Sequence, residues 1–118
     1  MFDDYDQSFR NSKSFQERKN YAAKLREKYP DRFPIIIETH RDLKLDKKKY
    51  LVPKNLSVGQ FFHLIRNRLK LSSEQGLFIF TEDGSIPPIS ESLEAIYKSA
   101  RNDDNFLYFK LSPETVFG

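Results

Sequence analysis

Phe-Pro-Ile-Ile-Ile, the run at residues 33–37, decides the fold of this chain, because a short apolar run with β-branched side chains is typical of a buried β-strand. Pro34 lies near the start of this predicted strand, where proline is tolerated. A second run, Lys-Lys-Lys-Tyr-Leu-Val-Pro at residues 47–53, is rich in lysine and ends in proline. Proteins use both residue types to protect the open edge of a sheet. We therefore expect residues 47–53 to form an edge strand with unpaired backbone groups.

A helix is predicted upstream of these strands, at residues 15–28. Ser14 and Glu17 have the spacing of a capping box, in which each side chain accepts a hydrogen bond from the other residue's backbone amide. The helix is expected to stop before Pro30, because proline disfavours helical geometry in the residue that precedes it. Residues 1–12 are polar with isolated aromatic side chains, and we expect either a tail or a short docking helix there.

Downstream, the pattern alternates between helices and strands. A second capping box at residues 57–60 begins an amphipathic helix that reaches Leu69. Residues 77–80 and 106–111 have the apolar and aromatic composition of strands. Between them, Ser92 can cap a short helix that ends near residue 100. The predicted order is two strands, a helix, a strand, a short helix and a last strand, with helical material in front.

Composition excludes several classes of protein. The chain has 118 residues, the length of one domain, and 14% of them are aromatic, which is too many for a disordered chain. No apolar run approaches the roughly 20 residues that span a bilayer, and residues 1–6 lack the pattern of a secretory signal. Without cysteine there is no disulfide, thiolate metal site or cysteine nucleophile. His40 and His63 are too far apart to suggest a metal cluster, and we expect His63 to be a partly buried helix residue. We expect neither an enzyme nor a bound cofactor or metal.

Charge is distributed unevenly along the chain. Residues 41–70 carry a net charge of +7, from nine basic and two acidic residues, whereas residues 71–118 carry −5, from three basic and eight acidic residues. A basic middle favours acidic partners, although two ordinary solvated faces of opposite sign would give the same counts. Nucleic acid is not expected as a partner, because the aromatic strand at residues 106–111 lies in the acidic part, which repels phosphate.

The predicted edge strand suggests a binding module. An extended peptide can add to such a strand through main-chain hydrogen bonds, while its alternate side chains enter pockets. The lysines at residues 47–49 would then favour peptides that carry Asp or Glu. Alternatively, these lysines serve only to prevent aggregation.

The last residues give a second indication of function. Residues 112–118 follow the last predicted strand and have little to pack against, so we expect a flexible tail that ends in Gly118. Glycine has no Cβ, which suits a terminal carboxylate that must enter a narrow catalytic channel. A disordered tail that merely stops at a glycine is the alternative.

Four blocks of sequence carry a resemblance to a known family. Residues 28–38 (Lys-Tyr-Pro-Asp-Arg-Phe-Pro-Ile-Ile-Ile-Glu), 45–53, 57–61 and 86–88 are similar to those of the autophagy-related ubiquitin-like modifiers. This group contains the GABA-receptor-associated protein and microtubule-associated light chain three. The resemblance runs in order from residue 15 to Gly118.

The resemblance implies an α+β, ubiquitin-like β-grasp fold with a four-stranded mixed sheet and two additional N-terminal helices. It divides the chain into a helical extension at residues 1–28, a β-grasp core at residues 29–111 and a conjugation tail at residues 112–118.

The resemblance also implies a function. The family's terminal glycine, here Gly118, is joined to the amine of phosphatidylethanolamine on autophagosomal membranes. The expected partners are a processing and deconjugating cysteine protease, E1-like and E2-like enzymes, and receptors with aromatic-x-x-aliphatic motifs. The expected unconjugated form is a cytoplasmic monomer.

The same resemblance assigns two peptide-binding pockets and their charged rim. The pocket for the aromatic residue is expected to be lined by Leu25, Pro34, Ile36, Lys49, Leu51 and Phe106. The pocket for the aliphatic residue is expected to be lined by Tyr50, Val52, Pro53, Leu56, Phe61 and Leu64. Contacts to acidic residues beside the motif are expected from Arg32, Lys47 and Arg68, together with Lys49.

Three features depart from the family pattern. Tyr21 stands beside the predicted aromatic pocket, where many members have a polar or acidic residue. The connection at residues 39–45 is shorter than usual, and the N-terminal extension is longer and rich in Asp. An alternative function from another class is a non-conjugated adaptor that binds tubulin or other acidic protein surfaces through its basic N-terminal half, residues 13–70.

Overall fold

The computed structural model describes residues 4–72 and 74–116. Its elements follow the predicted order, and both predicted capping boxes are formed, at Ser14 and Ser57. The elements are α1 (Ser8–Asn11), α2 (Phe15–Lys28), β1 (Arg32–Thr39), β2 (Lys49–Pro53), α3 (Val58–Leu69), β3 (Leu77–Thr81), α4 (Leu93–Ala100), β4 (Leu107–Pro113) and a 3₁₀ helix (Glu114–Val116).

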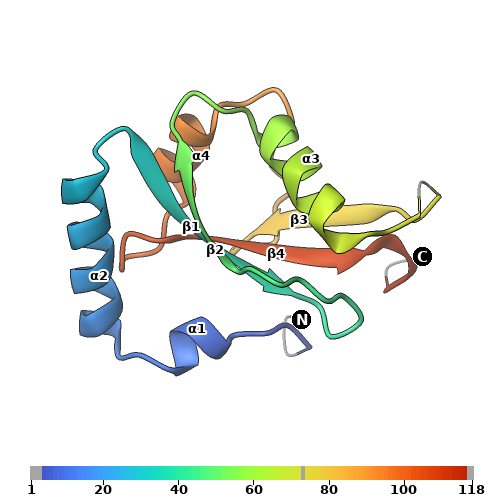
Figure 1. The fold of residues 1–118 in the computed structure, drawn as a ribbon, viewed down its shortest axis with the longest axis horizontal. Coiled ribbons are helices and arrows are strands. Elements are labelled where there is room, and N and C mark those ends of the chain that lie inside the picture. Colours follow the sequence, from blue (N-terminus) through green and yellow to red (C-terminus); the bar gives the residue numbers. More distant parts are fainter. Residues whose placement is uncertain (1–3, 73, 117–118) are drawn as a thin grey trace.

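The four strands form one mixed sheet in the order β2-β1-β4-β3. The central pair, β1 and β4, is parallel, and the two outer pairs are antiparallel. The sequence-predicted edge position of β2 is confirmed, because β1 is its one strand neighbour among residues 4–72 and 74–116. Figure 1 shows α3 and α4 on one side of this sheet and α1 and α2 on the other.

Side chains alternate between the two faces of a strand, and helices cover both faces of the central strands. Ile35 and Ile37 of β1 belong to the larger core, which is closed by residues of α3 and α4 such as Phe61 and Leu93. Ile36 faces the opposite side and packs in a second cluster with Ala22 of α2, Tyr108 of β4 and Phe106, which precedes β4. The continuous isoleucine run is therefore explained by a strand that is covered on both faces.

A buried charge network lies on the α1 side of the sheet. Glu38 of β1 is completely buried and accepts hydrogen bonds from Arg10 Nε at 2.8 Å and Arg10 Nη2 at 3.0 Å. Lys110, the β4 neighbour of Glu38 in the register, forms an ion pair with the same carboxylate. Arg10 also donates to Glu82 at 2.9 Å, and its guanidinium lies 3.9 Å from the Tyr108 ring centroid. These contacts attach the four-residue helix α1 to the sheet.

β4 and His63 differ from the sequence predictions. β4 continues to Pro113, because Ser112 and Pro113 pair with β3, and Ser112 is completely buried. After these two residues, Glu114–Val116 form the 3₁₀ helix, whose first N–H donates to the Gly76 carbonyl at 2.9 Å, and Gly118 lies outside the described residues. The expected partial burial of His63 is wrong: it is an exposed residue on the outer face of α3.

We predict that Glu38→Gln lowers the free energy of unfolding by about 3 kcal/mol, because it leaves Arg10 and Lys110 without their shared buried counter-charge. Lys110→Met is the matched variant. It should cost less than about 1 kcal/mol, because Arg10 still neutralises Glu38 and the methionine is of similar length. Urea denaturation of both variants measures the difference. Equal losses would show that Glu38 does not hold the network together.

Candidate functional site

The outer edge of β2 presents main-chain groups that the sheet does not use. Ile37 N–H donates to the Lys48 carbonyl at 2.8 Å, which marks a hydrogen-bonded pair in the antiparallel ladder. Hydrogen-bonded and non-hydrogen-bonded pairs alternate in such a ladder. The pairs Ile36–Lys49 and Pro34–Leu51 are therefore the non-hydrogen-bonded ones. It follows that the N–H and C=O groups of Lys49 and Leu51 point away from β1.

One of these outward carbonyls already has a partner. Arg32 Nη1 donates to the Leu51 carbonyl oxygen at 3.2 Å. Arg32 is one of the predicted contacts for acidic residues. It belongs to β1 and is exposed, and its guanidinium reaches the main chain of the edge strand β2. An added strand that uses this carbonyl would have to displace the guanidinium.

A pocket of about 420 Å³ opens between β2 and α3. All six residues of the sequence-predicted aliphatic pocket line it, together with Lys47, Leu51, Asn67 and Arg68. Phe61 forms part of the core beneath it, whereas Leu64 is 53% exposed. The structure therefore brings together the residues of β2, of α3 and of the turn between them that the family resemblance assigned to one pocket.

The rim of this pocket is polar and basic. The Tyr50 hydroxyl donates to the Lys47 carbonyl at 2.7 Å, and its ring packs edge-on against Phe61 at 5.6 Å between centroids. Burial raises the pKa of Tyr50, so its hydroxyl stays neutral. Arg68 forms two hydrogen bonds with the exposed carboxylate of Asp46, at 3.2 and 2.8 Å. Arg68 therefore lies at the predicted place but is paired within the chain.

The predicted aromatic pocket lies on the other face of β2 and is covered. Two of its residues, Ile36 and Phe106, are buried in the second cluster, and Leu25 packs against them. Phe9 of α1 and Tyr21 of α2 lie over Phe106, at 5.0 and 5.8 Å between ring centroids.

The remaining predicted residues of this pocket, Pro34, Lys49 and Leu51, lie on β1 and β2, with Pro34 opposite Leu51. Lys49 forms a hydrogen bond with the Tyr21 hydroxyl and lies 4.6 Å from its ring centroid. Tyr21 and Lys49 together bridge α2 and the edge strand. The sequence analysis placed Tyr21 beside this pocket but did not predict the contact of Phe9 with Phe106. The isolated aromatic residues at 1–12 indicated that this segment could dock, but not where.

Over residues 4–72 and 74–116, no group of three potential metal ligands among His, Cys, Asp and Glu is found. Within the same ranges, no helix has both the length and the apolar character needed to cross a bilayer.

The fold defines a ubiquitin-like protein of the β-grasp class, as expected: a four-stranded mixed sheet with α3 across one face. The family model described as "Autophagy protein Atg8 ubiquitin like" matches residues 17–118. The chain belongs to the Atg8 family.

Individual relatives agree with this assignment. Autophagy-related protein 8e of Arabidopsis thaliana is 45% identical over 113 residues, which cover 93% of this chain and 92% of that protein. Autophagy-related protein 8 of Mycosarcoma maydis is 45% identical over 114 residues, covering 94% and 96%. The crystal structure of Trypanosoma brucei ATG8 superposes with a TM-score of 0.83 and 41% identity, over 92% of this chain and 96% of that one.

Proposed function

We propose that this chain is a ubiquitin-like modifier of autophagy, conjugated through Gly118 to phosphatidylethanolamine, and that its β2 edge binds receptors with aromatic-x-x-aliphatic motifs. The observation that carries the receptor part is the open β2 edge beside a pocket of about 420 Å³. Membership of the Atg8 family supports the conjugation part.

The bound peptide is proposed to add as a further strand beside β2. Its main chain bonds the outward groups of Lys49 and Leu51, which do not serve the β1–β2 ladder. Its aliphatic side chain enters the pocket between β2 and α3. This places the aromatic side chain of the motif on the opposite face, over Ile36 and Phe106, where Tyr21 must move aside.

Charge supports a preference for peptides with acidic residues. Lys49 of β2, Lys47 before it and Arg32 at the start of β1 are exposed and carry no ion pair to a carboxylate within the described part of the chain. A carboxylate of the peptide can replace the Leu51 carbonyl as the partner of Arg32, so the guanidinium keeps a hydrogen bond when the new strand forms.

The conjugation step needs no nucleophile from this chain. A cysteine of an E2-like enzyme carries Gly118 as a thioester, and the amine of phosphatidylethanolamine attacks its carbonyl carbon. The C–N bond of the amide forms, the C–S bond breaks, and the thiol leaves with a proton. The lipid's two acyl chains anchor the product, because each buried methylene contributes about 0.8 kcal/mol. The protein is thus proposed to act as a modifier, not an enzyme, moving from cytoplasm to autophagosomal membrane.

Binding as an added strand can be tested with methylated peptides. A peptide with an acidic flank and an aromatic-x-x-aliphatic core is methylated at one main-chain nitrogen that would face β2. We predict a loss of affinity of about tenfold or more, because one intermolecular hydrogen bond is removed and a methyl group is placed in the strand interface. Methylation at the next nitrogen, which faces away, should cost much less, and calorimetry compares the two. Equal effects would exclude strand addition to β2.

The cover over the aromatic pocket gives a second prediction. Tyr21→Ala should raise the affinity for the same peptide by about two- to tenfold, because the ring and its Lys49 bond no longer have to be displaced. Tyr29→Ala, at the C-terminal end of the same helix, is the control and should leave the affinity unchanged. A weaker complex with Tyr21→Ala would mean that this ring contacts the ligand instead of covering its pocket.

The conjugation assignment is tested by substitution of Gly118. In a reconstituted reaction with E1-like and E2-like enzymes and liposomes that contain phosphatidylethanolamine, Gly118→Ala should abolish the lipid-linked product on gels. Thr115→Ala changes an exposed residue of the same segment and should be conjugated normally. Undiminished conjugation of Gly118→Ala would refute the assignment and favour the adaptor that acts without a lipid.

A further inference from the structure

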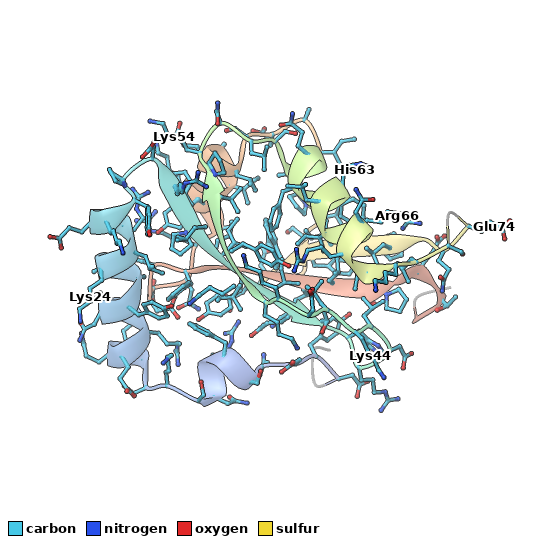
Figure 2. All side chains as sticks on the ribbon, viewed as in Figure 1. Lys24, Lys44, Lys54, His63, Arg66 and Glu74 are labelled. Atoms are coloured by element: carbon cyan, nitrogen blue, oxygen red, sulfur yellow. The ribbon has the colours of Figure 1, made fainter. Side chains whose placement is uncertain are left out.

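A second pocket lies away from the β2 edge site. It has a volume of about 560 Å³ and is bounded by α2, the start of β1, the turn after β2, and α4. It shares no lining residue with the pocket between β2 and α3. Figure 2 shows one of its residues, Lys54, at the end of the molecule where the turn after β2 approaches α4.

Positive charge dominates the walls of this pocket. Its lining includes four cationic side chains, Arg26, Lys54, Lys98 and Arg101, and a single carboxylate, Glu94. None of the four cations lies within 4.0 Å of a carboxylate oxygen in the described part of the chain. The pocket therefore holds a net positive charge that nothing in the described chain neutralises by direct pairing.

Aromatic rings lie beside both arginines, and the guanidinium of Arg26 is nearest to Phe33, 4.5 Å from its ring centroid. The guanidinium groups of Arg26 and Arg101 lie 5.6 and 5.8 Å from the centroid of Tyr97. Tyr97 is itself fixed, because it stacks on Phe33 at 4.3 Å and its hydroxyl donates to the Asn105 carbonyl at 2.5 Å. Burial raises the pKa of Tyr97, so the phenol remains a neutral donor and adds no negative charge.

Each arginine has a second support from the backbone or a neighbouring side chain. Arg26 donates to the Arg32 carbonyl at 2.9 Å, and Arg101 Nε donates to Asn105 Oδ1 at 3.3 Å. Side chains that are fixed before binding lose less entropy when a ligand arrives. The lysines, in contrast, are exposed and free to close over a ligand from two sides.

We propose that this pocket binds a compact anion with two or more phosphate groups, either a soluble polyphosphorylated molecule or the headgroup of a phosphoinositide lipid. Guanidinium forks match the oxygens of phosphate, and four cations exceed what a single monophosphate would neutralise. A concave site closed by α2 and α4 also suits a compact ligand better than an extended acidic chain. The proposal does not depend on conjugation at Gly118 or on peptide binding at β2.

The test uses the full, unconjugated chain and two probes. Inositol hexakisphosphate represents the soluble ligand, and phosphatidylcholine vesicles with a few per cent of phosphatidylinositol 4,5-bisphosphate represent the headgroup. Titration calorimetry and vesicle flotation at low salt measure binding. Lys54→Gln/Lys98→Gln removes two charges from the pocket and keeps the stacked arginines, so the fold should be preserved. Lys24→Gln/Lys44→Gln removes the same charge outside it (Figure 2).

We expect saturable binding of at least one probe, weakened about tenfold or more by Lys54→Gln/Lys98→Gln and less than about twofold by the control. Saturable binding of inositol hexakisphosphate alone would assign the site to a soluble molecule, and pocket-dependent vesicle binding would assign it to a lipid headgroup. The proposal is overturned if neither probe binds saturably, or if both double variants lose affinity equally, as a general attraction to positive charge predicts. Thermal unfolding verifies that both variants are folded.

Discussion

The parallel pairing of β1 with β4 is the constraint on which the rest of this structure depends. It buries both faces of β1, and therefore requires helices on each side of the sheet. It also fixes β1 in the middle of the strand order, so that β2, which follows it, can only add at the outside. The outward direction of the main-chain groups of Lys49 and Leu51 is thus a consequence of topology as much as of local sequence.

The two faces of the sheet are stabilised by different physical means. On the α3 and α4 side the contacts are apolar, as in Phe61 against Phe109. On the α1 side, charged groups are buried: Glu38 is shared by two cations, and Asp104 accepts hydrogen bonds from Arg18 and Tyr108. Buried charges require specific partners in specific places. The N-terminal helices are consequently positioned by a few directional contacts, and this is the face on which Tyr21 and Phe9 cover the predicted aromatic pocket.

Local patterns in the sequence predicted the elements and the edge strand, because capping boxes and lysine and proline in strands act over a few residues. The lining of the pocket between β2 and α3 came from the family resemblance and not from local patterns, and the structure brings those residues together. The cover formed by Phe9, the ion pair of Glu38 with Lys110, and the cationic pocket were not predicted. Their residues are distant in the chain, and only packing brings α1 to the sheet and α2 beside α4.

The hydrogen bond from Arg32 to the Leu51 carbonyl has a consequence for selectivity. An exposed strand edge is a template for indiscriminate association, including self-assembly into fibrils. Here an added segment has to break the hydrogen bond between Arg32 and the Leu51 carbonyl before it can bond that carbonyl itself. A neutral segment leaves the guanidinium without a new hydrogen-bond acceptor. A segment that brings its own carboxylate restores what it displaced. Arg32 thereby raises the free-energy cost of strand addition for neutral segments. Acidic ligands offset this cost because they give the guanidinium a new partner.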